Sequence, residues 1–280
     1  MPLTLKHRNQ IVAAYCILFY GLFIYKAWNG FLLSQLQPHL FSTRFDFASW
    51  LVMQTGLHQW LLDKPTGWIA FDLVFYSFPA LYWFVYQRRQ NLTPAIALLM
   101  LAVNWTYILC YTLYPANSIE SFTAWLLFPL LLMTTNLRSF YFVLHALRYF
   151  FLLFFASAAM WKFVQGGIFN PDQMSGVLLF QHKEYLASSS NWYTAFIYWL
   201  VNHASIGYCL YIAATIIEVS FVTGFFTKRF DKLLLFAFFV FLLFDVLVMR
   251  IPYWEIAPFA ITLWYSKYEL QLSYQKNFEL

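Results

Sequence analysis

Long apolar segments separated by short polar stretches run along the whole chain and predict membrane-spanning helices. The segments that we expect to span the membrane are residues 11–33, 68–86, 95–114, 122–135, 139–162, 204–226, 233–249 and 252–266. A helix needs about 20 apolar residues to cross roughly 30 Å of hydrocarbon, so a chain of 280 residues has room for about eight spans and little else. The segment 122–135, which contains Pro129, is the shortest of them.

This pattern predicts an all-α fold, a polytopic membrane helix bundle with about eight transmembrane helices. We expect residues 1–266 to form a single transmembrane domain and residues 267–280 to form a short cytoplasmic tail. Residues 34–67 predict an outer loop with an interfacial, partly re-entrant segment around 47–62. Residues 165–203, called the insert below, alternate turn-forming residues with apolar patches, and predict an outer-face loop carrying one or two interfacial helices.

Composition supports a membrane protein and excludes a sizeable soluble domain. Hydrophobic residues make up 62% of the chain and charged residues only 10%, against about 25% in typical soluble domains. The net charge of +5 comes from basic residues scattered at helix ends, so we predict no nucleic-acid partner. Cys16, Cys110 and Cys209 each fall inside an apolar segment without metal-ligand or disulfide spacing, so we predict no metal site.

The basic residues also predict the orientation of the bundle. With eight spans and both termini cytoplasmic, ten basic residues face inward: Lys6, Arg8, Arg88, Arg89, Arg138, Lys228, Arg229, Lys232, Lys267 and Lys276. Six face outward: Lys26, Arg44, Lys64, Lys162, Lys183 and Arg250. An excess of lysine and arginine on the cytoplasmic side is typical of membrane proteins. We therefore predict an integral membrane protein of the bacterial inner membrane with both termini in the cytoplasm.

Polar residues inside the predicted spans are the candidates for function. Within the spans lie Asp72, Asn104, His145, Arg148, Lys162, Glu218 and Asp245. Ionisable groups in a bilayer are costly, and they usually face the bundle interior and pair with one another. The predicted topology places four to six ionisable residues at a similar outer depth, from the set Asp72, Lys162, His203, Asp245, Arg250 and Glu255. This arrangement predicts an outward-facing pocket around Lys162, with Asp245 and His203 as its further catalytic candidates.

Each candidate also has a purely structural interpretation. The Lys162 side chain is placed well to extend to the outer headgroups, as lysines near helix ends do. Glu218 is expected near mid-span in a structural pair, with Arg148 as the candidate partner. His145 is more typical of a packing histidine, and His203, at the start of a span, of a helix-cap residue.

The segment Phe155–Phe163, with the sequence Phe-Ala-Ser-Ala-Ala-Met-Trp-Lys-Phe, resembles the transmembrane domain of vitamin K-dependent gamma-carboxylase and its bacterial relatives, the HTTM proteins. In that family a Tyr/Phe-x-x-Ala/Ser-Gly-x-x-Lys-Leu stretch closes a helix at the outer face. The likeness continues with His203 at the start of the next span, Glu218 at the position of an acidic residue, and Gly-Phe-Phe at 224–226. It covers approximately residues 148–266.

The resemblance implies a role for Lys162 as a base. In the carboxylase, a lysine amine deprotonates reduced vitamin K, which reacts with oxygen to give the base that removes a proton from substrate glutamate. Two features of this chain differ from the family pattern: Phe-Asp-Val at 244–246 replaces a histidine of the penultimate helix, and the chain ends at Leu280 without the luminal domain that holds protein substrates. We therefore expect no protein carboxylation, and a quinone or lipid-like molecule as the ligand.

Three functional hypotheses follow from the sequence. In the first, Lys162 acts with Asp245 or His203 on a quinone or other hydrophobic small molecule that enters from the lipid bilayer. In the second, the bundle is a non-catalytic membrane subunit or chaperone, and the insert docks a periplasmic or membrane protein partner. In the third, the protein is a redox helper similar to the DoxX/MauE membrane proteins, although the predicted outer segments contain no cysteine.

Overall fold

The computed structural model describes residues 2–36, 65–112, 122–188 and 190–270, together with residues 50, 53–56 and 59. Within these residues the fold is all-helical, as predicted, and the only extended pairing is a single bridge between Pro2 and Glu269. Most of the predicted interfacial segment around 47–62 lies outside the described residues, as does most of the predicted tail 267–280.

Six helices in the described part of the chain are long and apolar enough to cross a membrane. They are α1 (Leu5–Trp28), α4 (Pro65–Arg88), α5 (Thr93–Thr112), α7 (Leu137–Val164), α10 (Ala204–Ser220) with its continuation α11 (Thr223–Phe226), and α12 (Asp231–Phe244) with the π-helical turn η5 (Asp245–Met249). Fewer than half of the residues in each apolar stretch are buried inside the protein. The remaining apolar side chains need a non-aqueous environment, and these helices therefore support a polytopic integral membrane protein.

The structure does not establish the predicted count of eight spans. The segment predicted at 122–135 forms the ten-residue helix α6 (Thr123–Leu132), and the one predicted at 252–266 forms the 3₁₀ helix η6 (Trp254–Phe259) followed by α13 (Ala260–Tyr265). An α-helix of ten residues is about 15 Å long, half the hydrocarbon thickness. Both segments are mostly buried, and the Phe128 and Phe259 rings lie 6.0 Å apart. Protein thus covers these two short segments.

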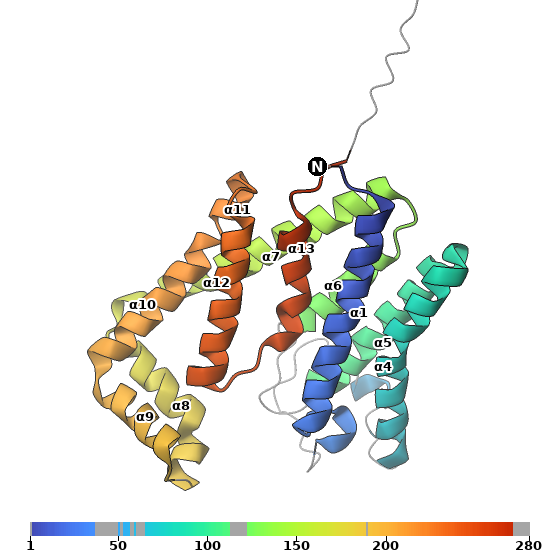
Figure 1. Cartoon of the computed structure of the whole chain (residues 1–280). Coiled ribbons are helices and arrows are strands. Elements are labelled where there is room, and N and C mark those ends of the chain that lie inside the picture. Colours follow the sequence, from blue (N-terminus) through green and yellow to red (C-terminus); the bar gives the residue numbers. More distant parts are fainter. Residues whose placement is uncertain are drawn as a thin grey trace, which may run out of the picture. The chain divides into compact units, whose positions relative to one another are not determined.

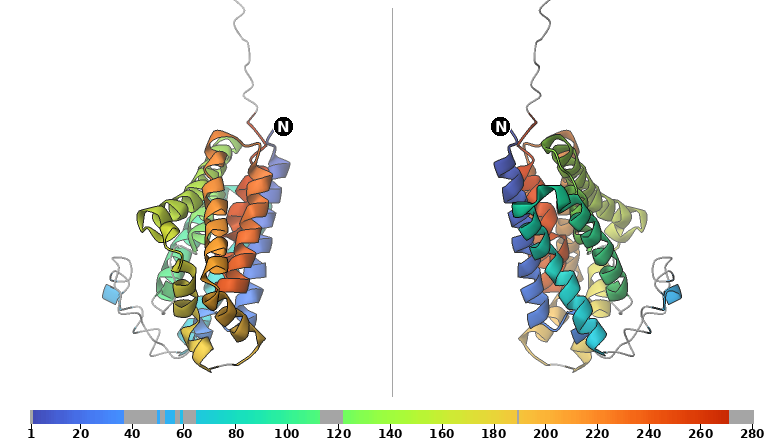
Figure 2. Two further views of the ribbon diagram at one scale, coloured as in Figure 1. Left: turned by 90° about the vertical axis from the view of Figure 1, so that its left-hand side faces the viewer. Right: turned by 90° about the vertical axis from the view of Figure 1, so that its right-hand side faces the viewer.

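The chain divides into two compact units, residues 1–147 with 254–280 (unit 1) and residues 148–253 (unit 2). In unit 1, α4 and α5 lie side by side, as the right-hand view of Figure 2 shows. Aromatic rings fill its interior: Phe75 stacks on Tyr107 at 3.8 Å, and Phe19 lies 4.9 Å from Trp125. The short 3₁₀ helices η1 (Leu33–Gln35) and η2 (Gln90–Leu92) follow α1 and precede α5.

Unit 2 combines the second part of α7 with α10, α11 and α12, and it includes the insert. The rings of Phe151, Phe155, Phe221 and Phe238 pack against one another between these helices. The insert contains the 3₁₀ helix η4 (Gly167–Phe169) and two α-helices, α8 (Gln173–Ser188) and α9 (Trp192–Asn202), which form a hairpin (Figure 1). The two α-helices match the predicted number of helices in this segment.

Gly224 provides a test of the packing between these helices. A Cβ atom at this position would lie 2.5 Å from Leu152 Cδ2 and 3.1 Å from Leu234 Cδ1, so Gly224→Ala should lower the unfolding free energy by about 1–3 kcal/mol. Gly21, on α1, has no atom within 4 Å of such a Cβ, so Gly21→Ala should stabilise by up to about 1 kcal/mol. Unfolding of both variants in mixed micelles measures the difference. Equal stabilities would contradict the close contact.

Candidate functional site

Lys162, in the last turn of α7, forms an ion pair with Glu218 of α10. The Lys162 Nζ to Glu218 Oε1 distance is 2.8 Å, and the side chains are 22% and 4% exposed. The ammonium also lies 5.0 Å from the centre of the Tyr211 ring. Tyr211 and Glu218 are seven residues apart, two helical turns, and therefore share one face of α10. Lys162 is thus held within unit 2 by a carboxylate and an aromatic ring.

This pairing places Lys162 beside the later turns of α10. Glu218 lies 15 residues beyond His203, about 22 Å along the helix. The Tyr208 hydroxyl donates to the Ile168 carbonyl at 2.6 Å, which shows that the chain after Lys162 continues beside the first turns of α10. Lys162 thus contacts residues eight and 15 positions beyond His203 in the chain, Tyr211 and Glu218. The sequence shows that Lys162 ends an apolar segment. It does not show which helix packs beside Lys162.

Arg148, the predicted partner of Glu218, binds Asp231 instead. Its Nε donates to Asp231 Oδ2 at 2.8 Å and its Nη2 to Asp231 Oδ1 at 2.6 Å, while Nη2 also reaches the Gly224 carbonyl at 2.9 Å. Asp231 begins α12, where an acidic side chain also suits the helix dipole. The prediction of an Arg148–Glu218 pair was wrong. Sequence reasoning overlooked Asp231, although it is the one acidic residue in a turn otherwise rich in basic residues.

Asp245 adds a second carboxyl group to the Lys162–Glu218 pair. It is buried at the first position of η5, and its carboxyl interacts electrostatically with both Lys162 and Glu218. We call these three residues the Lys162 centre. Two of its buried oxygens, Glu218 Oε2 and Asp245 Oδ2, have no hydrogen-bond partner. Buried polar atoms rarely stay unpaired, and one ammonium cannot neutralise two carboxylates. The centre can therefore hold a proton or accept hydrogen bonds from a bound molecule.

His203, the third catalytic candidate, has its contacts elsewhere. It joins α9 to α10, is exposed, and its Nδ1 donates to the Trp199 carbonyl at 2.7 Å. Its ring lies 4.9 Å from the Trp199 ring. The structure thus places Asp245 within electrostatic range of Lys162 and leaves His203 at the junction of two helices.

A second buried ionic centre lies in unit 1, and the sequence analysis did not identify it. Lys26 Nζ, in the last turn of α1, is 2.6 Å from Glu255 Oε1 of η6 and 3.3 Å from the Tyr111 hydroxyl. We call this group, with Asp72 and Tyr107, the Lys26 centre. Asp72 and Glu255, which the sequence grouped with Lys162, belong to this centre. Lys26 lies inside the predicted span 11–33, which was the available signal, but it was counted only among the outward-facing basic residues.

The carboxylate of Asp72 is held by three donors. It accepts hydrogen bonds from the Tyr107 hydroxyl at 2.6 Å and from the backbone amides of Leu33 at 3.2 Å and Ser34 at 2.9 Å. Both carboxylate oxygens of this buried side chain therefore have hydrogen-bond partners. Glu255 Oε2, in contrast, is buried without a partner. The Lys26 centre therefore ties η1, α4, α5 and η6 to the end of α1.

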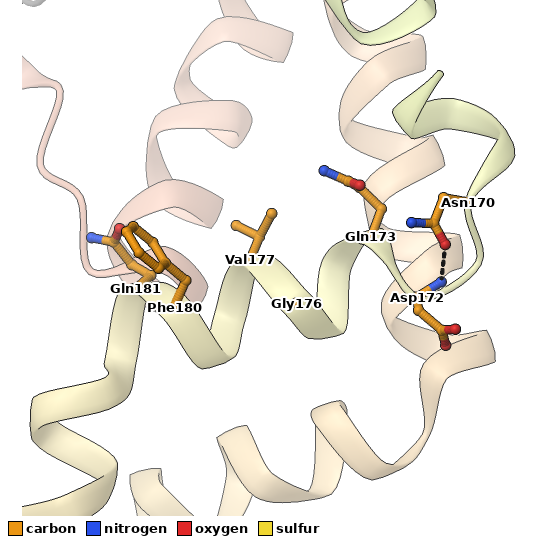
Figure 3. A pocket seen from close by; sticks show the side chains of 7 residues that line it. All are labelled: Asn170, Asp172, Gln173, Gly176, Val177, Phe180 and Gln181. Atoms are coloured by element: carbon orange, nitrogen blue, oxygen red, sulfur yellow. Dashed lines mark hydrogen bonds between the residues drawn. The ribbon is translucent and has the colours of Figure 1, made fainter. Parts of the chain in front are cut away.

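Beside the N-terminal part of α8, a shallow depression of about 320 Å³ opens to the outside (Figure 3). Its lining residues are Asn170, Asp172, Gln173, Gly176, Val177, Phe180 and Gln181. Asp172 is the only ionisable side chain among them, and its backbone amide donates to Asn170 Oδ1 at 3.1 Å. None of the three catalytic candidates lines this depression. No group of three or more metal-ligating side chains occurs in the part of the chain that the structure describes.

No family model matches this chain, and comparisons with curated proteins and with solved structures return no match. Its function must therefore be inferred from the Lys162 centre itself.

Proposed function

We propose that unit 2 binds the polar head of a quinone or other lipid-like molecule at the Lys162 centre and exchanges a proton with it. The observation that carries this proposal is the pair of unpartnered carboxyl oxygens, Glu218 Oε2 and Asp245 Oδ2, around one partly exposed ammonium. A ligand hydroxyl would supply the donor that these oxygens lack, and its oxygen would accept from Lys162.

The three side chains have complementary roles in this proposal. Lys162, the most exposed of them, meets the ligand oxygen and stabilises negative charge on it when a hydroxyl loses its proton. Glu218 holds the ammonium in place through Oε1 and keeps Oε2 free as a proton acceptor. Asp245 provides a second carboxyl group that accepts a hydrogen bond from the ligand or shares the proton that the ligand gives up. The Tyr211 ring beside Lys162 offers a flat apolar surface for a ring-shaped head.

The resemblance to the vitamin K-dependent carboxylase supports the same residue and the same class of ligand. In this resemblance, Lys162 matches the lysine that acts as the base in that family. The resemblance also implies a quinone as the ligand. Protein carboxylation is not part of the proposal. The proposal also leaves out His203, because its contacts are with Trp199 rather than with the Lys162 centre.

An alternative function is that of a non-catalytic membrane subunit or chaperone whose insert docks another protein. This alternative is favoured by aromatic side chains of the insert that are strongly exposed, among them Phe169, Phe180 and Trp192. The same side chains suit the lipid interface, where tryptophan and other aromatic residues gather. In this alternative the Lys162 centre only holds α7, α10 and η5 together.

Co-purification of a ligand separates the two functions. We expect protein purified in native lipid to retain a quinone or isoprenoid lipid, measured by mass spectrometry of the organic extract. Lys162→Met should lose this molecule about 10-fold or more, since a charge-assisted hydrogen bond is worth about 1.5–3 kcal/mol. Lys183→Met, which removes an exposed lysine of the insert, is the matched control and should retain the ligand.

Two results would overturn the proposal. One is equal retention of the ligand by the wild type and by Lys162→Met. The other is a wild-type protein that retains no such molecule while Lys162→Met is only less stable, which would leave the Lys162 centre a structural role.

A further inference from the structure

The Val248 carbonyl lies in the last turn of the α12–η5 helix, where carbonyls have no donor within the helix. Pro252, which follows soon after, has no N–H group to offer. Arg250 ends the helix with a φ of 53°, the left-handed conformation that non-glycine residues adopt rarely. Val248 therefore needs a donor from another part of the chain.

The insert supplies two donors to this carbonyl. His182 Nε2, from α8, lies 2.9 Å from the Val248 oxygen, and the Tyr193 hydroxyl, from α9, donates to it at 3.2 Å. A carbonyl oxygen only accepts, so Nε2 of His182 carries a proton. Burial raises the pKa of Tyr193, although nearby Arg250 acts in the opposite direction, so the hydroxyl stays protonated and able to donate. His182 itself is 3% exposed.

The insert and η5 also share a hydrophobic core. Five buried residues form it: Met174, Leu178, Ile197, Leu200 and Val248. Phe244 and Met249, which lie on either side of Asp245 in the sequence, pack against the same cluster. The neighbours of Asp245 thus pack against α8 and α9, together with Leu210 and Tyr211 of α10.

The end of η5 folds back onto Asp245 itself. The Asp245 carbonyl accepts from the amide of Ile251 at 3.1 Å and from the amide of Arg250. The Arg250 guanidinium lies 4.4 Å from the Tyr185 ring centre and 5.3 Å from that of Tyr193. Single π-helical turns within α-helices are rare and frequent at functional sites. The position of Asp245 therefore depends on contacts with the insert.

We propose that His182, assisted by Tyr193, is a positioning residue that fixes η5 and thereby sets the Asp245 carboxyl beside Lys162 and Glu218. This inference rests on the proposed function of the Lys162 centre. It makes the insert a structural part of the site, because α8 and α9 supply the donors that the end of the helix lacks. His182 acts through the backbone of Val248 and does not itself meet the ligand.

Infrared titration of the Asp245 carboxyl tests this role without any ligand. The carboxylic-acid band that disappears in Asp245→Asn is followed against pH in detergent-purified protein. In His182→Leu its midpoint should be displaced by about one pH unit, since moving a carboxyl relative to a neighbouring charge changes its titration by at least that much. His182→Gln, which keeps a donor near Nε2, should restore the midpoint. His203→Leu, an exposed histidine at the end of the insert, is the matched control.

Tyr193→Phe keeps the test decisive if His182→Leu fails to fold, because it removes only the longer of the two hydrogen bonds. A smaller displacement in Tyr193→Phe supports the inference. An unchanged midpoint in every folded variant of His182 and Tyr193 overturns it, and so does a displacement of equal size in His203→Leu. A wild-type protein without a bound quinone or lipid, but with a band that responds to His182, would overturn the proposed function alone.

Discussion

Replacing Asp231 by asparagine should cost about 3–5 kcal/mol of unfolding free energy, because it leaves a buried guanidinium without its counter-charge. Arg148 is 1% exposed and makes two hydrogen bonds to this carboxylate, so water cannot replace the lost partner. The Gly224 carbonyl is the remaining acceptor that the structure gives to the guanidinium, and it carries no charge. The loss should appear as a lower denaturant midpoint in mixed micelles.

Asp172→Asn is the matched control, since Asp172 is an exposed aspartate of the same unit. It should change the unfolding free energy by less than about 0.5 kcal/mol. The double variant Arg148→Met with Asp231→Leu should regain much of the stability lost in Asp231→Asn, because it leaves no unpaired charge. If Asp231→Asn and Asp172→Asn proved equally stable, the buried pair would not hold α7 to α12.

Lys26→Met should have a similar effect in unit 1, about 3–5 kcal/mol, because it leaves the buried Glu255 carboxylate unpaired. It also removes the ammonium from between the Tyr111 and Phe122 rings, which lie 4.7 and 5.0 Å from Nζ. Thermal unfolding followed by circular dichroism in detergent measures the loss.

Lys6→Met, on the same helix, removes an exposed lysine and should be close to neutral. Adding Glu255→Gln to Lys26→Met should recover part of the loss, since the remaining side chain is uncharged. The Lys26 centre would be a minor contributor to stability if Lys26→Met behaved like Lys6→Met, or if the second substitution lowered stability further.

The sequence predicted burial of polar side chains much better than it predicted their partners. Six polar residues expected inside the spans are indeed buried: Asp72, Asn104, His145, Arg148, Glu218 and Asp245. Burial follows from the apolar segment around each residue, which one sequence reveals. Pairing depends on which helix faces meet and at what register. Arg148 therefore received the wrong partner, and the Lys26–Glu255 pair, which joins residues 229 positions apart, was not found.

The number of spans shows a similar limit. Hydropathy marks α6 and the η6–α13 segment as apolar but cannot tell a lipid-exposed span from a short segment buried in protein. Pro129 and Pro258 lie inside these two segments and restrict regular helix there. The need of the Val248 carbonyl for an outside donor could have been anticipated, because carbonyls in the last turn of a helix have no donor within it. Its partners, His182 and Tyr193, lie 66 and 55 residues earlier and could not.

The central claim is that the Lys162 centre holds the polar head of a bound molecule. A density map of the protein in native lipid, at a resolution that shows side chains, tests it most directly. We predict non-protein density within hydrogen-bond distance of Lys162 Nζ and of Glu218 Oε2 or Asp245 Oδ2. A map in which protein side chains fill this space and satisfy both carboxyl oxygens would contradict the claim.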